Sequence, residues 1–303
     1  MNSKFFICLS AVFIVACIAS CAQIETHKVS PAATGAAIQN VHSDHYVYLN
    51  SSVKPLNKLL ISIVGTGGHA DNFSSFSIAA ANLGYHVISI DYKNEVVTTA
   101  CSNSADSSCF DEFRQEIVFG TQVSDTVKVD SANSIYNRIV KLVTYLSENH
   151  KNENWKQFIK GRDINWAKCT LVGHSQGAGH AAYIAKHHAV EKAIMLAGPQ
   201  DYRSNFSSPA MWLSLPGKTD PVRYYALLHE KDPYDCKKQT ANCMVLMQGG
   251  NPSTVTLNDV APYEGKGNIF ITNIATNQPH GIVTDALFIK TWQYILQEEP
   301  HKK

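Results

Sequence analysis

The sequence Gly173-His174-Ser175-Gln176-Gly177 is the most informative part of this chain, because of the residues on either side of it. Before it runs Lys168-Cys169-Thr170-Leu171-Val172, a short apolar and β-branched stretch that predicts a buried strand. After it, residues 178–186 predict a helix, with small residues where its backbone must lie close to the sheet. The two glycines indicate a tight, strained turn in which a side chain would collide with the neighbouring strand or helix.

A strand, a serine between two glycines and a helix together resemble the nucleophile elbow of the α/β-hydrolase superfamily, in particular of its serine esterases and lipases. The bare motif is short enough to occur by chance, so its flanking elements and its partners further along the chain carry the resemblance. The resemblance implies an α/β-hydrolase fold, with a mostly parallel central sheet, helices on both faces and a small cap insertion. It also implies that Ser175 is a nucleophile.

Strands alternate with helices along the rest of the chain, and this order by itself predicts a largely parallel sheet covered by helices on both faces. The amphipathic stretch 131–149 predicts one of the helices. Tyr46-Val47-Tyr48-Leu49 alternates in polarity and predicts an early edge strand. Buried strands are expected over residues 59–64, 85–90, 192–197, 223–229 and 268–274.

Length and charge limit the classes of protein that are possible. A chain of 303 residues with ordinary apolar content suits one large α/β domain, which we place over residues 45–303. Its formal net charge of +1 gives no electrostatic reason to expect nucleic acid as a partner.

Residues 1–20 have the pattern of a signal peptide, with Lys4 followed by an apolar run that is too short for a comfortable membrane span. Ile18-Ala19-Ser20-Cys21 resembles a bacterial lipobox, which would place a lipid on Cys21 and tether the protein to a membrane. Cleavage after Ala22 would instead give a soluble secreted protein. Both routes predict export, as a periplasmic or cell-envelope lipoprotein or as a secreted protein. Residues 23–44 are small and polar and predict a spacer.

Export makes disulfide bonds possible among the five cysteines that follow the leader. Cys101 and Cys109 bracket one polar loop and Cys236 and Cys243 bracket another, so two local pairs are the simplest of the three possible pairings. Cys169 lies in the strand before the elbow and is expected to be a buried free thiol. No histidine accompanies either pair at ligand spacing, and we expect no metal site there.

The strand at 59–64 ends in Gly65-Thr66-Gly67-Gly68, the position of the oxyanion loop in the α/β-hydrolase superfamily. Val64 stands where that family usually has a histidine, which matters little because a main-chain N–H is the donor. The resemblance implies that the N–H of Thr66 and the N–H of Gln176 form the oxyanion hole. A phosphate-binding loop is excluded by the missing Gly-Lys-Ser/Thr, and the glycines do not match a dinucleotide fingerprint.

A serine hydroxyl becomes a nucleophile only when a base removes its proton, and the base needs an acceptor that fixes its tautomer. The superfamily places these groups in the order serine, acid, histidine. Asp232 in the turn Glu230-Lys231-Asp232-Pro233 and His280 after the last strand fit that order. Asp201, which follows the preceding strand, is the alternative acid. His229 is expected to pack, and the histidines on or beside the elbow are expected to pack or to lie at the surface.

These residues predict a serine hydrolase that cleaves a small-molecule or lipid ester through an acyl-enzyme, with no metal or organic cofactor. An acyltransferase on the same triad and a hydrolase-fold binding protein without catalysis remain the alternatives. Insertions are expected at about 93–125 and 198–221. The second is apolar and rich in proline, so it resembles the cap of the superfamily, although a loop packed on the sheet would share that composition.

Overall fold

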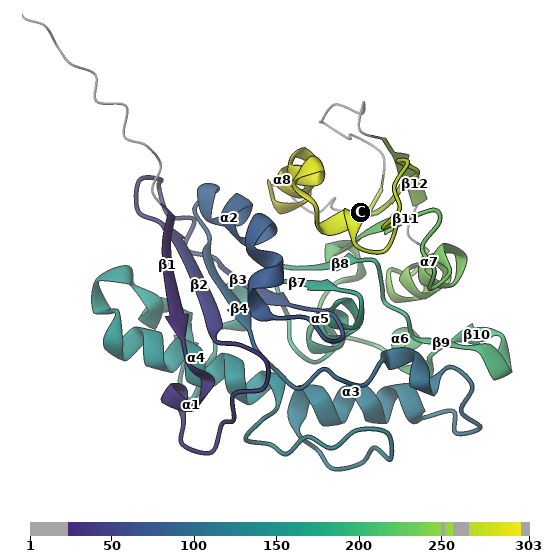
Figure 1. Ribbon diagram of the computed structural model, residues 1–303, viewed down its shortest axis with the longest axis horizontal. Helices are drawn as coiled ribbons and strands as arrows, with labels where there is room; N and C mark the ends of the chain where they lie inside the picture. The colour runs from purple at the N-terminus through teal and green to yellow at the C-terminus, as the bar shows by residue number, and fades with distance from the viewer. Residues whose placement is uncertain (1–23, 250–251, 257–266, 298–303) are drawn as a thin grey trace, which may run out of the picture.

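A computed structural model describes residues 24–249, 252–256 and 267–297. Its centre is a nine-stranded sheet in the order β1-β2-β4-β3-β7-β8-β11-β13-β12 (Figure 1). The strands are β1 Ile24–Val29, β2 His45–Asn50, β3 Leu59–Ile63, β4 His86–Ile90, β7 Cys169–His174, β8 Lys192–Leu196, β11 Tyr224–His229, β12 Pro252–Val255 and β13 Ile269–Thr272.

The sheet is mostly parallel. Only β1 with β2 and β2 with β4 pair antiparallel, and the other neighbouring strands pair parallel. Every residue of β3, β4 and β8 is buried, which explains why these strands are mostly apolar in the sequence. Ile63 at the end of β3 lies opposite Gly173 of β7, so the glycine loop and the serine turn meet at one edge of the sheet.

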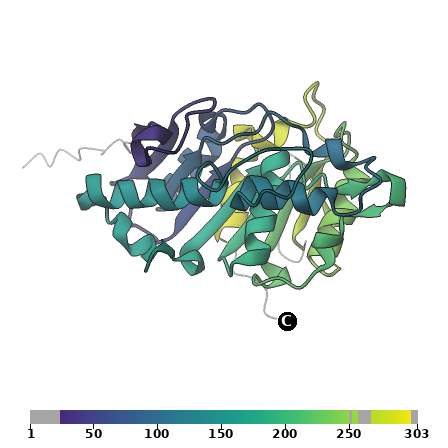
Figure 2. The same cartoon turned by 90° about the horizontal axis from the view of Figure 1, so that it is seen from below.

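Helices cover both faces of the sheet, as predicted (Figures 1 and 2). Helices α2 (Ser74–Asn82) and α8 (Ile289–Gln297) pack together on one face. On the other face, α3 (Cys109–Phe119) packs against both α4 (Ile135–Asn149) and α5 (Gln176–His187). The remaining helices are α1 Pro31–Thr34, α6 Met211–Ser214 and α7 Cys236–Leu246.

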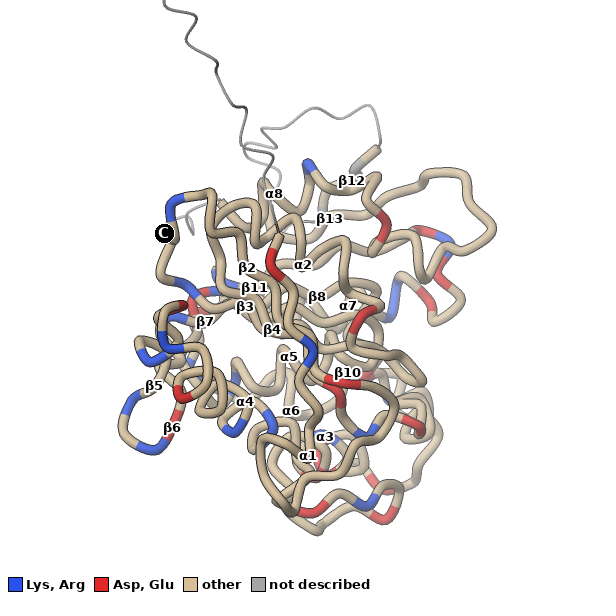
Figure 3. Tube along the Cα trace, turned by 60° about the vertical axis from the view of Figure 1, so that its left-hand side comes forward, with Lys and Arg blue, Asp and Glu red and all other residues tan. Residues whose placement is uncertain are grey.

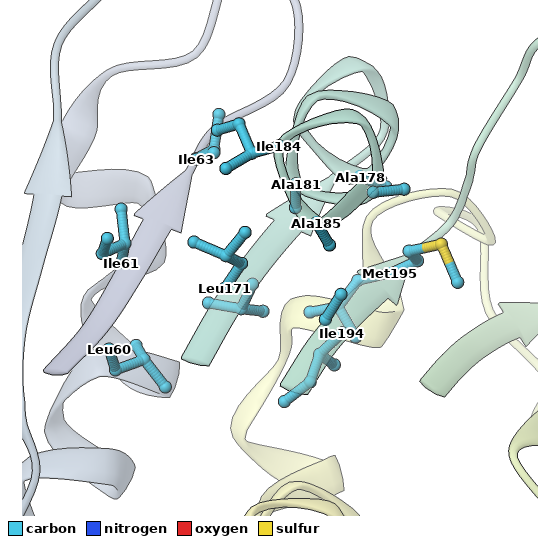
Figure 4. Packing of buried hydrophobic residues seen from close by; sticks show 14 of the residues in the cluster. Leu60, Ile61, Ile63, Leu171, Ala178, Ala181, Ile184, Ala185, Ile194 and Met195 are labelled. Atoms are coloured by element: carbon cyan, nitrogen blue, oxygen red, sulfur yellow. The ribbon is translucent and has the colours of Figure 1, made fainter. Parts of the chain in front are cut away.

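The elbow helix α5 lies directly on the centre of the sheet. Figure 4 shows its alanine side chains, among them Ala181 and Ala185, facing the isoleucine and leucine side chains of β3, β7 and β8. Ala181, Leu171 and Ile194 are fully buried. Small side chains let the helix backbone approach the strands, and dense packing there holds the turn between β7 and α5 in place.

The predicted spacer over residues 23–44 is wrong for much of its length. Ile24–Val29 forms the edge strand β1, and α1 packs against α4. Thr26 and Lys28 of β1 are exposed, because an edge strand with one solvated side carries polar residues, and this gives it the composition of a linker. Consequently β2, which we expected at the edge, lies inside the sheet.

One of the two predicted disulfides is present. Cys101 and Cys109 are bonded, and Cys169 is a buried free thiol, as expected. The pairing of Cys236 with Cys243 is wrong, because both are buried free cysteines of α7. Seven residues of helix separate their Cα atoms by about 10 Å, whereas a disulfide needs less than about 7 Å.

The two predicted insertions lie against each other. The first contains α3, and the second contains α6 and a small hairpin of β9 (Tyr202–Arg203) and β10 (Ser208–Pro209). The N–H of Ser204 in the second donates to the carbonyl oxygen of Ser102 in the first at 2.8 Å. A second small ribbon, β5 (Ile159–Lys160) with β6 (Asp163–Ile164), follows α4.

Charged residues of both signs are interspersed over the described chain rather than gathered by sign (Figure 3). Within these ranges, no helix combines the length and the apolar character that crossing a membrane requires. The predicted leader at residues 1–20 lies outside the described residues.

Candidate active site

Ser175 occupies the turn between β7 and α5 in a strained conformation. Its φ is 56° and its ψ is −119°, outside the regions that a residue with a side chain normally adopts. Its N–H donates to the carbonyl oxygen of Leu196 in β8 at 2.8 Å. Backbone strain of this kind persists only where the surrounding structure enforces it, and it is concentrated at functional sites.

The two glycines of the motif are required by close backbone contacts. A Cβ atom on Gly173 would lie 2.0 Å from the carbonyl oxygen of Gly177, and one on Gly177 would lie 2.1 Å from the carbonyl oxygen of Ile63. Because the obstacles are backbone atoms, they could not move aside without displacing β3 or α5. The predicted steric reason for these glycines is therefore confirmed.

Ser175 and His280 line the same cavity, which has a volume of about 360 Å³. The glycine loop after β3 forms another part of its wall. The cavity is lined by Val64, Gly65, Thr66, Gly67, Gly68, Asn72, Phe73, His174, Ser175, Tyr234, His280 and Thr284. The structure thus gathers Ser175, His280 and Thr66 from three separate parts of the chain at the carboxyl edge of the parallel strands.

Asp232 and His280 form a hydrogen-bonded pair, with 2.8 Å between His280 Nδ1 and Asp232 Oδ2. Burial alone would raise the pKa of Asp232, but the hydrogen bond and charge of His280, with the N–H of Tyr234, outweigh burial and lower it. The carboxyl group is therefore ionised at neutral pH. When Nδ1–H donates to this carboxylate, Nε2 is left as the basic nitrogen of the ring.

His229, at the end of β11, connects the turn that carries Asp232 with the segment that leads to His280. Its Nδ1 accepts the N–H of Lys231 at 2.9 Å, and its Nε2 lies 2.9 Å from the carbonyl oxygen of Ile274, to which it donates. His229 is buried, so the expectation that it packs holds, and it also fixes the geometry of the pair.

Ser175 Oγ accepts a hydrogen bond from Nε2 of Gln200 at 3.1 Å. Among the described residues, no hydrogen bond joins Ser175 Oγ directly to His280, although both line the cavity. Gln200 is buried in a loop that α7 supports. The side chain of Asn242 in α7 donates to the carbonyl oxygen of Pro199 in this loop at 3.0 Å. Sequence analysis missed Gln200, whose one signal is its position just after the strand next to the elbow.

Asn94 holds the glycine loop in shape. Its side-chain amide donates to the carbonyl oxygens of Gly65 at 3.1 Å and Gly68 at 2.9 Å, and its main-chain oxygen accepts the N–H of Gly67 at 3.2 Å. Among the described residues, the N–H of Thr66 has no acceptor and stays free for a ligand. The N–H of Gln176 lies in the first turn of α5, where helical N–H groups lack a partner within the helix. Sequence analysis missed Asn94 as well.

The alternative acid, Asp201, has different partners. Its two carboxylate oxygens accept from Nε and Nη2 of Arg114 at 3.0 and 2.7 Å, and Trp212 Nε1 donates to it at 3.0 Å. Both members of this ion pair are fully buried. Asp201 thus anchors α3 under the elbow, whereas Asp232 holds His280.

His174 stands beside the pair without the properties of a base. Burial, followed by the nearby His280, lowers the pKa of His174 to about 4, so its ring is neutral at pH 7. Its Nε2 lies 2.9 Å from the carbonyl oxygen of His280 and donates to it. His174 therefore supports the backbone of the histidine loop.

The sheet order, the turn between β7 and α5 and the helices on both faces define the α/β-hydrolase fold.

No protein-family model matches the chain, and no curated protein matches it. Two of the solved structures that match are a protein from Klebsiella pneumoniae subsp. pneumoniae provisionally assigned as a dienelactone hydrolase and TT1662 from Thermus thermophilus. The first is 8% identical with a TM-score of 0.48, and the second is 11% identical with a TM-score of 0.45; each match covers 91% of this chain and 100% of the other. Likeness at this level says nothing about activity.

Proposed function

We propose that this protein is a serine hydrolase that cleaves a carboxylic ester through an acyl-enzyme. One observation carries the proposal: a serine in a strained strand-to-helix turn shares a cavity with a histidine that is hydrogen-bonded to a buried, ionised aspartate. Strain, burial and an oriented imidazole are costly features, and a surface used only for binding needs none of them.

In the proposed reaction, Ser175 Oγ attacks the ester carbonyl carbon while His280 Nε2 takes the hydroxyl proton. Asp232 stabilises the imidazolium that results. The N–H groups of Thr66 and Gln176 stabilise the oxyanion, and the proton then passes to the departing alkoxide. Water repeats the sequence on the acyl-enzyme, and an alcohol in its place would give acyl transfer.

The hydrogen bond from Gln200 fits this role for Ser175. Because the amide of Gln200 is the donor, it uses a lone pair of Oγ and leaves the hydroxyl hydrogen available to a base. The proposal therefore requires only that His280 and Ser175 Oγ come within hydrogen-bond distance when substrate is bound, and such contacts are often long in a free enzyme.

The cavity favours a small ester. Its volume of about 360 Å³ lies at the lower end of the range for ligand sites, roughly 300–1,000 Å³. Polar groups such as Asn72 and Thr284 share its wall with the apolar Phe73. We accordingly propose short acyl chains as the preferred substrates.

We also propose that the protein is exported, with a lipid on Cys21 or with cleavage after Ala22. The Cys101–Cys109 disulfide gives weak support, since such bonds persist mainly in oxidising compartments. Mass spectrometry of the mature N-terminus tests this, because a chain that begins at diacylated Cys21 is heavier than one that begins at Gln23 by the lipid and by the residues Cys21 and Ala22.

Turnover of p-nitrophenyl esters of rising acyl length tests the proposed activity. We expect the highest kcat/KM for acetate or butyrate, and a loss of roughly 10⁴-fold or more in kcat for Ser175→Ala. Product analysis with added alcohol distinguishes hydrolysis from transfer. If wild type and Ser175→Ala turn over every ester at the same rate, the proposed function is wrong.

A further inference from the structure

Two imidazoles and a carboxylate converge at the edge of the sheet. None of these three side chains lines the cavity that contains Ser175. His27 lies on β1, His150 follows the last residue of α4, and Glu153 ends the short 3₁₀ turn η3 (Lys151–Glu153). Glu153 Oε1 is 2.8 Å from His27 Nε2 and 3.1 Å from His150 Nδ1. One ligand atom from each residue lies within 4.8 Å of the other two.

This geometry is close to what a metal ion requires. Zinc binds imidazole nitrogen and carboxylate oxygen at about 2.0–2.2 Å, so the donor atoms of a tetrahedral site are separated by roughly 3.3 Å. The separations of 2.8 and 3.1 Å are shorter than that value by about half an ångström or less, so small side-chain movements would admit an ion. We propose that His27, His150 and Glu153 bind one divalent transition-metal ion of the zinc type, with water completing its coordination.

The donor set also selects the kind of ion. Imidazole nitrogen suits zinc and its first-row neighbours, whereas Mg²⁺ and Ca²⁺ prefer oxygen ligands throughout. A site with two histidines and one carboxylate therefore binds Zn²⁺ in preference to Mg²⁺ at equal concentration.

Neighbouring groups orient the carboxylate as a ligand needs. Glu153 Oε2, the other carboxylate oxygen, accepts the Nε1–H of the buried Trp155 at 2.7 Å. His86 Nε2 lies 2.7 Å from the main-chain oxygen of Glu153 and anchors the turn. Such outer contacts fix ligand geometry in metal sites. The side chains of His27, His150 and Glu153 are 26%, 25% and 17% exposed, which leaves a path for the ion to enter.

The ion would link strand β1 to the turn that follows α4. His27 and Glu153 are 126 residues apart in the chain, and among the described strands β1 lies at the edge and pairs with β2 alone. A ligand that binds the folded chain but not the unfolded chain stabilises the fold by mass action. Zinc should therefore hold β1 against the end of α4 and raise the melting temperature, with no direct part in ester cleavage.

Isothermal titration of the full chain, made without a polyhistidine tag, with ZnCl₂ tests the site, and MgCl₂ is the negative control. We expect one equivalent of Zn²⁺ to bind and to raise Tm. His27→Gln, His150→Gln and Glu153→Gln should each weaken binding by about tenfold or more. His187→Gln, which alters an exposed histidine outside the cluster, should leave binding unchanged.

Replacement by Co²⁺ supplies a second measurement, because its visible absorption reports nitrogen and oxygen ligands and should be lost in the same three variants. Circular dichroism establishes that each variant is folded. Absence of saturable Zn²⁺ binding to wild type, or equal binding by wild type and the three variants, would overturn the proposal.

Discussion

Gln200 acts on the serine through a single hydrogen bond, and its removal should alter rate more than binding. Gln200→Ala deletes the donor to Ser175 Oγ, so the hydroxyl loses one of the contacts that fix its rotamer. We expect kcat to fall roughly tenfold, the equivalent of about 1.4 kcal/mol, with KM little changed. Steady-state kinetics on a short-chain ester measures this. Asn205→Ala, an exposed change in the same insertion, is the control, and an equal loss in both variants would contradict the role of Gln200.

Asn94 acts on the proposed oxyanion loop rather than on substrate. Asn94→Asp keeps the size of the side chain but removes the N–H donors to the carbonyl oxygens of Gly65 and Gly68. A carboxylate facing two carbonyl oxygens would repel them and displace the loop. We expect kcat to fall by roughly 10²-fold, the scale of losing one oxyanion donor. Full activity in a folded Asn94→Asp protein would show that the loop does not depend on this residue.

Residues with their own chemistry could be proposed from the sequence, whereas the residues that support them could not. Ser175 carries a motif, and Asp232 and His280 follow from chain order and loop placement. Gln200 and Asn94 act through contacts between loops that are far apart in the chain, so local patterns do not reveal them. Their position in loops that follow β4 and β8 was the available signal.

Helix α3 is fixed under the elbow by one buried ion pair. Arg114 pairs with Asp201 and also donates to the main-chain oxygen of Gln176 at 2.7 Å. A Cβ atom on Gly179 would lie 2.0 Å from Arg114 Nη2, so the second glycine of α5 makes room for the guanidinium group.

Arg114→Met should therefore be strongly destabilising. It leaves the Asp201 carboxylate buried without its partner, which costs about 3–5 kcal/mol of unfolding free energy. Urea denaturation measures the loss. The double variant Arg114→Met/Asp201→Asn removes the isolated charge and should recover part of it. If the double variant is less stable than Arg114→Met, electrostatics is not the cause.

The cysteines of α7 give a simple chemical prediction. Alkylation of the unfolded, non-reduced chain should modify Cys169, Cys236 and Cys243, and reduction should be needed to modify Cys101 and Cys109. Peptide mass spectrometry measures both steps. A Cys236–Cys243 disulfide in the folded protein would show that α7 is not helical between them.

Helix α7 shows why elements with polar buried faces are hard to predict from the sequence. Its buried positions have helical spacing, but they include two amides that bond to the loop after β8. No apolar stripe marks the helix, so its cysteines looked like the ends of a polar loop. The apolar elements at the centre of the sheet were predictable because burial there is supplied by isoleucine, leucine and valine. Strand β1 was not predicted because its outer side faces solvent and carries polar residues.

For the whole molecule, buried neutral histidines should make the fold sensitive to acid. Burial, aided by Arg138, lowers the pKa of His45 to about 3, and burial lowers that of His174 to about 4. In the unfolded chain both titrate near 6.5, so between pH 6.5 and 4 the unfolded state binds protons that the folded state does not. Stability therefore falls as the pH drops through this range, by roughly 3 kcal/mol for His174 alone.

Urea unfolding at pH 7 and pH 4.5 measures this loss. His45→Asn keeps an acceptor for the Asp91 N–H that His45 Nδ1 now binds at 2.9 Å, but it cannot be protonated. We expect the difference in unfolding free energy between the two pH values to shrink in this variant. An unchanged difference would mean that His45 does not contribute to acid sensitivity.

Labelling with a fluorophosphonate probe tests whether Ser175 is a nucleophile that His280 activates. We expect folded wild-type protein to be labelled at Ser175, Ser175→Ala not to be labelled, and His280→Gln to be labelled at least about 10³-fold more slowly. Failure of the folded wild-type protein to react, or equal labelling of wild type and His280→Gln, would contradict it.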